Sequence, residues 1–107
     1  MPLGSQQQIH ILHVDDNPSI TDLTATFLED EDDRFSVETA IDADKALNTI
    51  HNRPQPPDCV VSDYDMPGMD GIEFLQIVRK EHPMLPFILF TGKGSEEIAS
   101  DAISAGV

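Results

Sequence analysis

Three short apolar segments of the sequence lead into side chains that can bind a cation or a phosphate. Asp15 and Asp16 follow the first segment, and Asp63 closes the second. Thr91 comes directly after the third. Carboxylate oxygens select hard cations such as Mg²⁺, Mn²⁺ or Ca²⁺, and Mg²⁺ commonly takes one or two carboxylates together with a substrate phosphate. A carboxylate beside such an ion can attack a phosphorus centre, because the ion neutralises charge in the transition state.

The segments that precede these side chains have the patterns of strands. Ile9–Val14 and Asp58–Asp63 are largely apolar, as buried parallel strands are, and Phe87–Phe90 is wholly apolar. Phe35–Ala40 alternates apolar and polar residues like a half-exposed strand. We therefore expect four strands.

A helix is expected after each of the first two strands. Asp15-Asp16-Asn17-Pro18 is typical of a helix start, with proline near the first helical position. The apolar residues that follow recur at helical spacing and should lie as one stripe against the sheet; they are Ile20, Leu23, Phe27 and Leu28. Asp42 is a good N-cap for the second helix, in which Ala46, Leu47 and Ile50 should face inward.

Two more helices are expected in the second half of the chain. Gly71–His82 has apolar residues at helical intervals, and prolines follow it; the apolar residues are Ile72, Phe74, Leu75, Ile77 and Val78. Ser95 is a good N-cap for the last helix, which should end at Gly106. The acidic Glu96 and Glu97 suit its first turn, and one face should carry Ile98, Ala102 and Ile103.

Four strand–helix units in succession predict an α/β fold with a parallel sheet, right-handed crossovers and helices on both faces. Ligands of such sheets bind at the carboxyl ends of the strands, near the topological switch point. Asp15, Asp16, Asp63 and Thr91 stand at those ends. Each of them alone could simply cap a helix or start a turn, but three strand ends together favour a functional site.

The 107 residues predict one domain, residues 9–107, preceded by a flexible leader, residues 1–8. The sequence has no apolar run of the roughly 20 residues that a membrane span requires and no signal-peptide pattern, so we expect a cytoplasmic protein. Cys59 lies in an apolar run, where a small buried hydrophobic residue without a redox role is expected. His10 and His13 should point to opposite faces of a strand and cannot chelate one metal ion together.

The chain is strongly acidic, with 20 acidic against 6 basic side chains and a net charge of −14. Such a polyanion repels the phosphates of nucleic acids and anionic lipid headgroups, so neither nucleic acid nor a membrane is expected as a direct partner. We interpret the acid excess as halophilic, because mobile cations screen the repulsion in high salt. The run Glu29–Asp33 lacks a turn glycine and fits a solvated loop at the end of a helix rather than a metal site.

Three separated motifs resemble the receiver domain of two-component response regulators, the family of the chemotaxis regulator CheY. The motifs are Val14–Pro18 (VDDNP), Val61–Gly71 (VSDYDMPGMDG) and Phe87–Gly92 (FILFTG). They occur in the family's order and at the predicted strand ends, and the resemblance runs from Ile9 to the C-terminus. It implies a flavodoxin-like three-layer sandwich with strand order 2-1-3-4-5.

The resemblance also implies how such a site works. Asp63 would accept a phosphoryl group from a histidine kinase, and the domain would then switch conformation and act on a downstream output domain or protein. Asp16 and Asp63 would hold Mg²⁺ with the backbone carbonyl of Asp65, whereas Asp15 would bind it through water. Thr91 would hydrogen-bond the phosphoryl oxygen. The domain would be a phosphoacceptor rather than an enzyme, with at most self-phosphorylation and self-dephosphorylation chemistry.

The sequence departs from the family at its C-terminal end. Family members continue into a fifth strand, which carries an aromatic switch residue and then a lysine that pairs with the phosphoryl group, and into a fifth helix. Lys93 lies on another loop and does not match that lysine; it could pair with Asp65, or both charges could be solvated. We therefore expect a C-terminally truncated receiver domain that phosphorylates slowly. Because of its open edge at Phe87–Phe90, the chain should either be less stable than a longer version or self-associate.

Two other phosphate-handling families match less well. Asp63–Met66 fits the first four positions of the DxDx[T/V] motif of haloacid dehalogenase phosphatases, but Pro67 breaks the fifth and the segment lies on the third strand rather than the first. A nucleotide-binding loop at Gly92–Ser95 fails because Phe87 replaces its leading glycine and Gly94 its Ser or Thr. Multiple turnover on a phosphate ester would favour a phosphatase, and a stoichiometric acyl phosphate would favour a receiver domain.

A calcium-binding loop is a third class of site to consider. Asp63, Asp65 and Gly68 match positions one, three and six of an EF-hand loop. Pro67 at position five and Phe74 at position twelve remove two ligands, including the bidentate one. The sequence therefore disfavours an EF-hand.

Overall fold

A computed structural model of the chain describes residues 8–91 and 96–107. Within these ranges strands and helices alternate as the sequence predicts. The elements are β1 (Ile9–Val14), α1 (Pro18–Glu31), β2 (Phe35–Ala40), α2 (Ala43–Asn52), β3 (Cys59–Asp63), α3 (Gly71–Glu81), β4 (Phe87–Phe90) and α4 (Glu96–Ala105). The strands match the expected segments, except that β3 begins at Cys59 instead of Asp58. No helix in the described ranges combines the length and the apolar character needed to cross a membrane.

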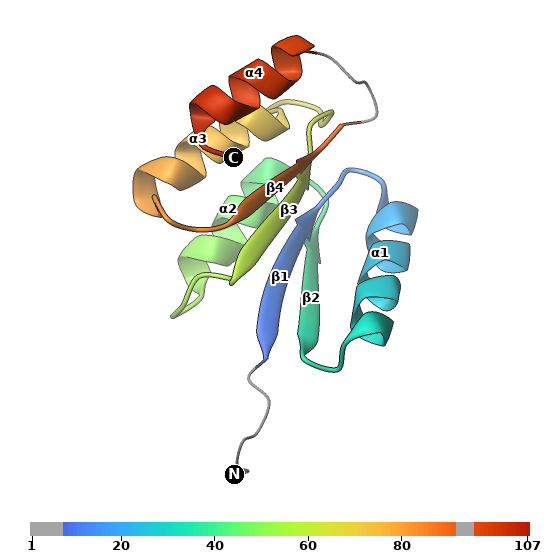
Figure 1. Ribbon diagram of the computed structural model, residues 1–107. Helices are drawn as coiled ribbons and strands as arrows, with labels where there is room; N and C mark the ends of the chain where they lie inside the picture. The colour runs from blue at the N-terminus through green and yellow to red at the C-terminus, as the bar shows by residue number, and fades with distance from the viewer. Residues whose placement is uncertain (1–7, 92–95) are drawn as a thin grey trace.

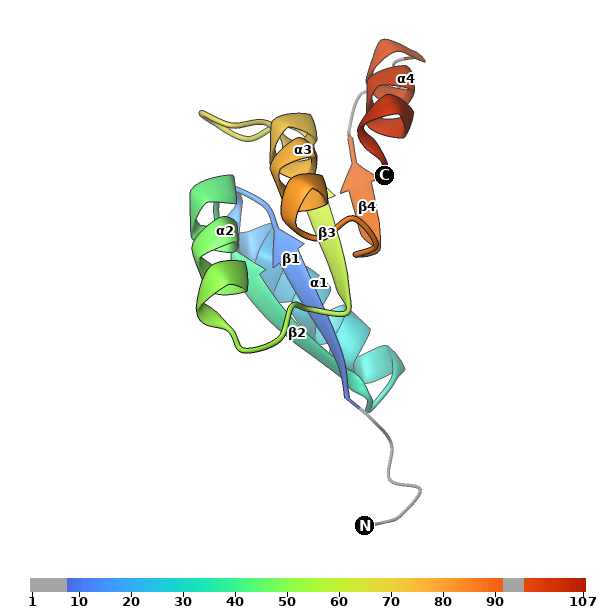
Figure 2. The same cartoon turned by 90° about the vertical axis from the view of Figure 1, so that its left-hand side faces the viewer.

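The strands form one parallel sheet in the order β2-β1-β3-β4. Figures 1 and 2 show α1 on one face of the sheet and α2 and α3 on the other, so the molecule has three layers. The order confirms the doubly wound α/β fold expected from the sequence. In such a sheet the strand order reverses beside β1, so the carboxyl ends of β1 and β3 flank the switch point.

The main core lies between the sheet and the pair α2 and α3. Its central side chains are completely buried: Val14, Ala46, Val60, Phe74 and Leu75 are each 0% exposed. The rings of Phe74 and Phe87 meet edge to face with their centroids 5.5 Å apart, which is a favoured aromatic arrangement. The expected inward faces of α2 and α3 are therefore confirmed.

Helix α1 differs from the expectation of one apolar stripe against the sheet. Its buried residue is Thr21, whereas Ile20, Leu23 and Phe27 are 43%, 69% and 62% exposed. Successive helical residues are separated by about 100°. The strip of α1 that carries Thr21 and the partly buried Leu28 faces the sheet, so the neighbouring strip with Leu23 and Phe27 extends beyond the contact.

The acidic run after α1 is more helical than expected. Helix α1 continues through Glu31, so only Asp32 and Asp33 of the run lie beyond it. The Asp32 carboxylate accepts hydrogen bonds from the Arg34 side chain, with a shortest N···O distance of 2.7 Å, and from the Arg34 backbone N–H at 2.8 Å. These bonds lower the pKa of Asp32 from 3.8 to about 2. The run remains at the surface, as the sequence predicted.

Helix α4 packs against α3 and ends where the sequence predicted. Gly106 adopts a left-handed conformation (φ +97°), which allows the chain to leave the helix. Ala102 is buried, but Ile103 is 74% exposed, so the expected inward face that included Ile103 is wrong. Ile103 lies about 100° around the helix from Ala102, which places it outside the buried face of α4. The proposed N-cap, Ser95, lies outside the described residues.

Candidate functional site at the carboxyl edge of the sheet

Three carboxylates meet at the carboxyl edge of the sheet. Asp15, Asp16 and Asp63 each offer an oxygen, and these oxygens lie within 4.8 Å of one another. The register explains this proximity, because Val14 of β1 pairs with Ser62 of β3 and the acidic residues come next along each strand. Asp15 and Asp63 are partly buried, whereas Asp16 is exposed. The structure therefore brings together the three carboxylates that the sequence singled out.

The turn after β1 holds Asp15 and Asp16 at this edge. Asp15 Oδ1 accepts a hydrogen bond from the backbone N–H of Asn17 at 2.9 Å. Asn17 is the N-cap of α1, and its Oδ1 accepts from the N–H groups of Ser19 at 3.0 Å and Ile20 at 3.4 Å. This cap satisfies two N–H groups of the first helical turn and fixes where the chain turns.

Among the described residues, no basic side chain forms an ion pair with the three carboxylates of this cluster. The pKa of Asp63 is raised above its ordinary value, first by partial burial and then by the negative charges of Asp15 and Asp16. Backbone hydrogen bonds from Asp65 and Tyr64 oppose this shift only in part. The Asp65 N–H lies 3.3 Å from Asp63 Oδ1. The ion pairs formed among described residues are elsewhere: Asp32–Arg34, His51–Glu81 and Glu38–Arg53. Three converging oxygen ligands without a protein cation fit a hard divalent ion.

The loop from β3 to α3 closes against the end of β3. The N–H of Gly71 donates to the carbonyl of Tyr64 at 2.9 Å. A Cβ atom on Gly71 would lie 2.5 Å from the carbonyl oxygen of Asp63, 2.7 Å from Leu89 Cδ1 and 2.9 Å from Tyr64 Cα. Glycine is therefore required there because the loop approaches the backbone of the phosphoacceptor candidate too closely for any side chain. Gly68 supplies the left-handed turn of the loop (φ +79°).

Asp70 has a structural role that the sequence reasoning missed. Its Oδ1 accepts from the N–H groups of Ile72 at 3.0 Å and Glu73 at 2.9 Å, and Glu73 Oε1 accepts from the Asp70 N–H at 3.2 Å. This reciprocal pair is a capping box that starts α3. The Asp-x-x-Glu spacing before an apolar helix was the signal that could have revealed it.

Thr91 stands at the same edge, directly after the next strand, β4. Asp63 pairs with Phe90 in the register of β3 and β4, so Thr91 lies one residue beyond the partner of Asp63. Both Thr91 and Asp65 are exposed. Lys93, which the sequence offers as a partner for Asp65, lies outside the described residues.

His13 is a second feature that the sequence left unremarkable. It is only 2% exposed and its Nδ1 has no hydrogen-bond partner among the described residues. Burial lowers the pKa of His13, and the charge of Asp15 partly opposes that effect. His10 is exposed, so the two histidines do point to opposite faces of β1. Cys59 is partly rather than fully buried, and burial raises the pKa of its thiol.

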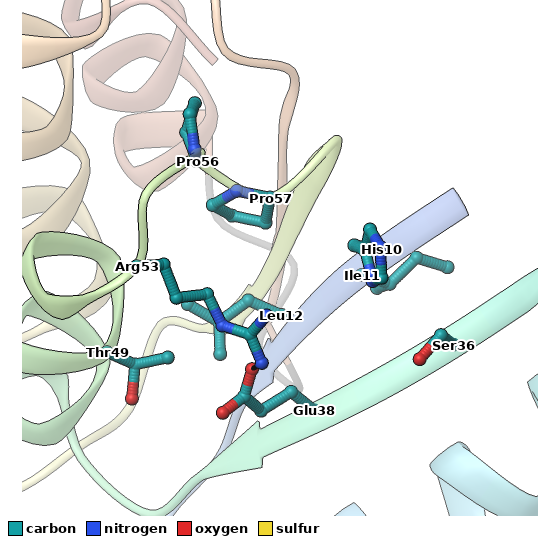
Figure 3. A pocket seen from close by; sticks show the side chains of 9 residues that line it. All are labelled: His10, Ile11, Leu12, Ser36, Glu38, Thr49, Arg53, Pro56 and Pro57. Atoms are coloured by element: carbon teal, nitrogen blue, oxygen red, sulfur yellow. Dashed lines mark hydrogen bonds and ion pairs between the residues drawn. The ribbon is translucent and has the colours of Figure 1, made fainter. Parts of the chain in front are cut away.

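The opposite, amino-terminal end of the strands holds a polar cavity that is too small for a substrate. Figure 3 shows the Arg53 guanidinium directed at the Glu38 carboxylate, with Ser36 and Thr49 on either side. The cavity measures about 40 Å³, which is room for about one water molecule.

Comparison with known proteins decides the family. The sequence profile of the response regulator receiver domain matches residues 11–107. The chain belongs to this family. The receiver domain is 43% identical over 98 residues to the nitrogen assimilation regulatory protein NtrX of Azorhizobium caulinodans, in an alignment that covers 90% of this chain and 21% of that protein. It thus spans about a fifth of the length of that relative.

Solved structures agree with this assignment. A CheY-like receiver domain protein from Methanospirillum hungatei superposes with a TM-score of 0.85 at 33% identity, covering 94% of this chain and 78% of that one. Chemotaxis protein CheY4 of Vibrio cholerae superposes with a TM-score of 0.84 at 30% identity, covering 94% and 82%. The receiver fold also argues against the EF-hand alternative, because Asp63 ends a strand and an EF-hand loop follows a helix.

Proposed function

We propose that this receiver domain accepts a phosphoryl group on Asp63 from a phosphohistidine of a histidine kinase. The observation that carries the proposal is the position of Asp63 at the carboxyl edge of the sheet, where its carboxylate meets those of Asp15 and Asp16. The N–H of Asp65 engages Oδ1 of Asp63, which leaves Oδ2 to act as the nucleophile. As the new P–O bond forms, the P–N bond breaks and its electron pair returns to the imidazole nitrogen of the donor.

Mg²⁺ is the cation that we propose for the acidic cluster. Asp16 and Asp63 would be direct ligands together with the backbone carbonyl of Asp65, and Asp15 would act through water. The donor set fits, since it is all oxygen and the oxygens of the three carboxylates already converge. A bound Mg²⁺ would supply positive charge to the phosphoryl oxygens. The hydroxyl of Thr91 would then donate to a phosphoryl oxygen from the neighbouring strand.

The wider role follows from family membership. We propose that residues 9–107 are the receiver module of a larger signalling protein or work with a separate output partner, which agrees with the short part of NtrX that they match. The module would work in the cytoplasm as a phosphoacceptor with no catalytic turnover beyond its own phosphorylation and dephosphorylation. Its net charge of −14 suits a salt-rich interior and disfavours direct contact with nucleic acid or a membrane.

The site assignment can be tested with beryllofluoride, which mimics a phosphoryl group on a carboxylate. We expect the wild-type domain to form the adduct in the presence of Mg²⁺, as observed by fluorine NMR. Asp63→Asn should abolish the adduct, and Asp16→Asn should weaken it by about tenfold or more through the lost metal ligand. Asp58→Asn, at the other end of β3, is the matched control and should behave like wild type. An adduct of undiminished strength in Asp63→Asn would show that the site is misassigned.

A further inference from the structure

The last position of β3 that faces α3 is occupied by a serine. Ser62 is 0% exposed, as is Val60, the previous residue on the same face of the strand. Val60 belongs to the core between the sheet and the pair α2 and α3, so the Ser62 side chain points into the same apolar layer. A buried hydroxyl costs free energy unless it is hydrogen-bonded. The partner of this hydroxyl therefore shows what a serine gains over an apolar residue at this position.

The Ser62 hydroxyl donates to the main chain of the proposed phosphoacceptor. Its Oγ lies 3.0 Å from the carbonyl oxygen of Asp63. A Cβ atom on Gly71, the first residue of α3, would lie 2.5 Å from the same oxygen. The Asp63 carbonyl is thus turned toward the α3 side of the sheet, where Gly71 covers it and Ser62 supplies a donor.

The peptide group between Asp63 and Tyr64 is held at both of its polar ends. Its carbonyl accepts the hydrogen bond from Ser62. Its N–H, which belongs to Tyr64, donates to the carbonyl of Phe90 at 2.7 Å. The two bonds together fix the plane of this peptide at the point where the chain leaves β3.

The next peptide group, between Tyr64 and Asp65, is held in the same way. The Tyr64 carbonyl accepts from the N–H of Gly71 at 2.9 Å, and the Asp65 N–H donates to Oδ1 of Asp63 at 3.3 Å. The partners of these two peptides are backbone groups, the carboxylate of Asp63 itself and the hydroxyl of Ser62. Ser62 is therefore the side chain through which the sequence sets this turn.

We propose that Ser62 is a positioning residue for the phosphoacceptor site, an inference that rests on the proposed function. Its hydroxyl fixes the peptide after Asp63, and through the next peptide it holds the Asp65 N–H against Oδ1. The Asp65 carbonyl, the proposed backbone ligand of Mg²⁺, follows directly along the chain. Successive side chains of a strand point to opposite faces, so Ser62 acts on the Asp63 carboxylate through the backbone rather than by touching it.

Removal of the hydroxyl should loosen the whole turn. The Asp63 carbonyl would lose this donor beneath Gly71, and a desolvated carbonyl without a partner is costly enough to favour rotation of its peptide. That rotation would move the Asp65 N–H, whose bond of 3.3 Å to Asp63 Oδ1 is already the longest in the turn. The Asp63 carboxylate and the Asp65 carbonyl would then shift together, so both the affinity for Mg²⁺ and the rate of phosphorylation should fall.

Tyr64 gives a direct readout of this turn, because it is the one tyrosine of the chain, which has no tryptophan. Its fluorescence is followed as Mg²⁺ is added without a phosphoryl donor, in about 1 M KCl to screen unspecific attraction of cations. We expect Ser62→Ala to weaken Mg²⁺ binding by about tenfold, the low end for groups that orient metal ligands, and to slow labelling by acetyl phosphate by a similar factor. Ser62→Thr keeps the hydroxyl and should restore both properties.

Thr21→Val is the matched control. Thr21 is likewise buried, and its Oγ1 donates to a backbone carbonyl, that of Pro18, at 2.8 Å in the first turn of α1. The general cost of deleting a buried hydroxyl should therefore appear in the urea unfolding of both Thr21→Val and Ser62→Ala. Mg²⁺ affinity and labelling rate should change in Ser62→Ala alone.

The positioning role would be refuted by a folded Ser62→Ala variant that binds Mg²⁺ and is labelled like wild type. An equal loss of both properties in Thr21→Val, or a folded Ser62→Thr variant as impaired as Ser62→Ala, would refute it too. A wild-type domain that binds Mg²⁺ but takes no phosphoryl group would instead count against the proposed function. In that case a weaker Mg²⁺ affinity of Ser62→Ala would still support the positioning role.

Discussion

Replacing Gly71 by alanine tests how tightly the β3–α3 loop is tied to the phosphoacceptor strand. The added Cβ would lie 2.5 Å from the Asp63 carbonyl oxygen and 2.9 Å from Tyr64 Cα. Both are backbone atoms and cannot rotate away, unlike the Leu89 side chain. Such overpacking costs about 2–3 kcal/mol, from which the better helix propensity of alanine recovers less than about 1 kcal/mol.

We therefore expect Gly71→Ala to lower the free energy of unfolding by about 2 kcal/mol, a large part of the 5–15 kcal/mol typical of a domain. Gly68→Ala is the matched control, because nothing lies within 4 Å of its added Cβ and only the left-handed φ of +79° opposes it. That strain should cost about 1 kcal/mol. Since Gly71→Ala also displaces the backbone of Asp63, it should weaken the beryllofluoride adduct, whereas Gly68→Ala should not.

Urea unfolding followed by circular dichroism gives the two free energies, and fluorine NMR gives the adduct. A Gly71→Ala variant that is as stable as wild type, or that is destabilised no more than Gly68→Ala, would contradict the predicted clash. A destabilised Gly71→Ala variant that binds beryllofluoride normally would also contradict it, because displacement of the Asp63 backbone should weaken the adduct.

Three further predictions concern the helix ends and the surface charge. Arg79 Nε donates to the Gly106 carbonyl at 2.6 Å, so Arg79→Gln should lower the free energy of unfolding by about 2 kcal/mol. It should also speed the hydrogen exchange of α4 more than that of the sheet, and Lys80→Gln is the neutral control. The pKa of Asp32 falls from 3.8 to about 2 on folding, so its contribution to the stability of the fold is complete above pH 3.8 and is lost as the pH falls toward 2. Between pH 3.8 and 2, the urea midpoint of Asp32→Asn should therefore fall less than that of wild type. Thermal melts should shift upward as KCl rises from about 0.1 M to 1 M, since the Debye length shrinks from ~10 Å to ~3 Å, and a flat melting temperature would contradict the halophilic interpretation.

Local patterns in the sequence were sufficient to predict the strands and the acidic cluster. Residues at the ends of parallel strands must share one edge of the sheet, so the positions of Asp15, Asp16 and Asp63 followed once the strand segments were recognised. The same argument placed Thr91 beyond β4. The strands and their shared edge followed from short-range periodicity and from the parallel crossovers, whereas the order of the strands was implied by the resemblance to the family.

The features that the sequence did not predict depend on which element packs over which residue. Leu23 and Phe27 have helical spacing typical of a buried stripe, but the rotation of α1 on the sheet leaves them exposed. Ile103 is exposed for the same kind of reason on α4. The Gly71 contact joins residues from α3, β3 and β4, so no pattern within one segment could reveal that a Cβ would clash there.

The most direct test of the proposed function is to locate the phosphoryl group. The domain is incubated with acetyl phosphate and Mg²⁺, digested under acidic conditions, and analysed by mass spectrometry. We predict one phosphoryl group per chain on Asp63, its loss in Asp63→Asn or when a chelator removes Mg²⁺, and wild-type labelling in Asp58→Asn. Equal labelling of Asp63→Asn, or a phosphoryl group carried by another residue of the wild-type domain, would contradict the account.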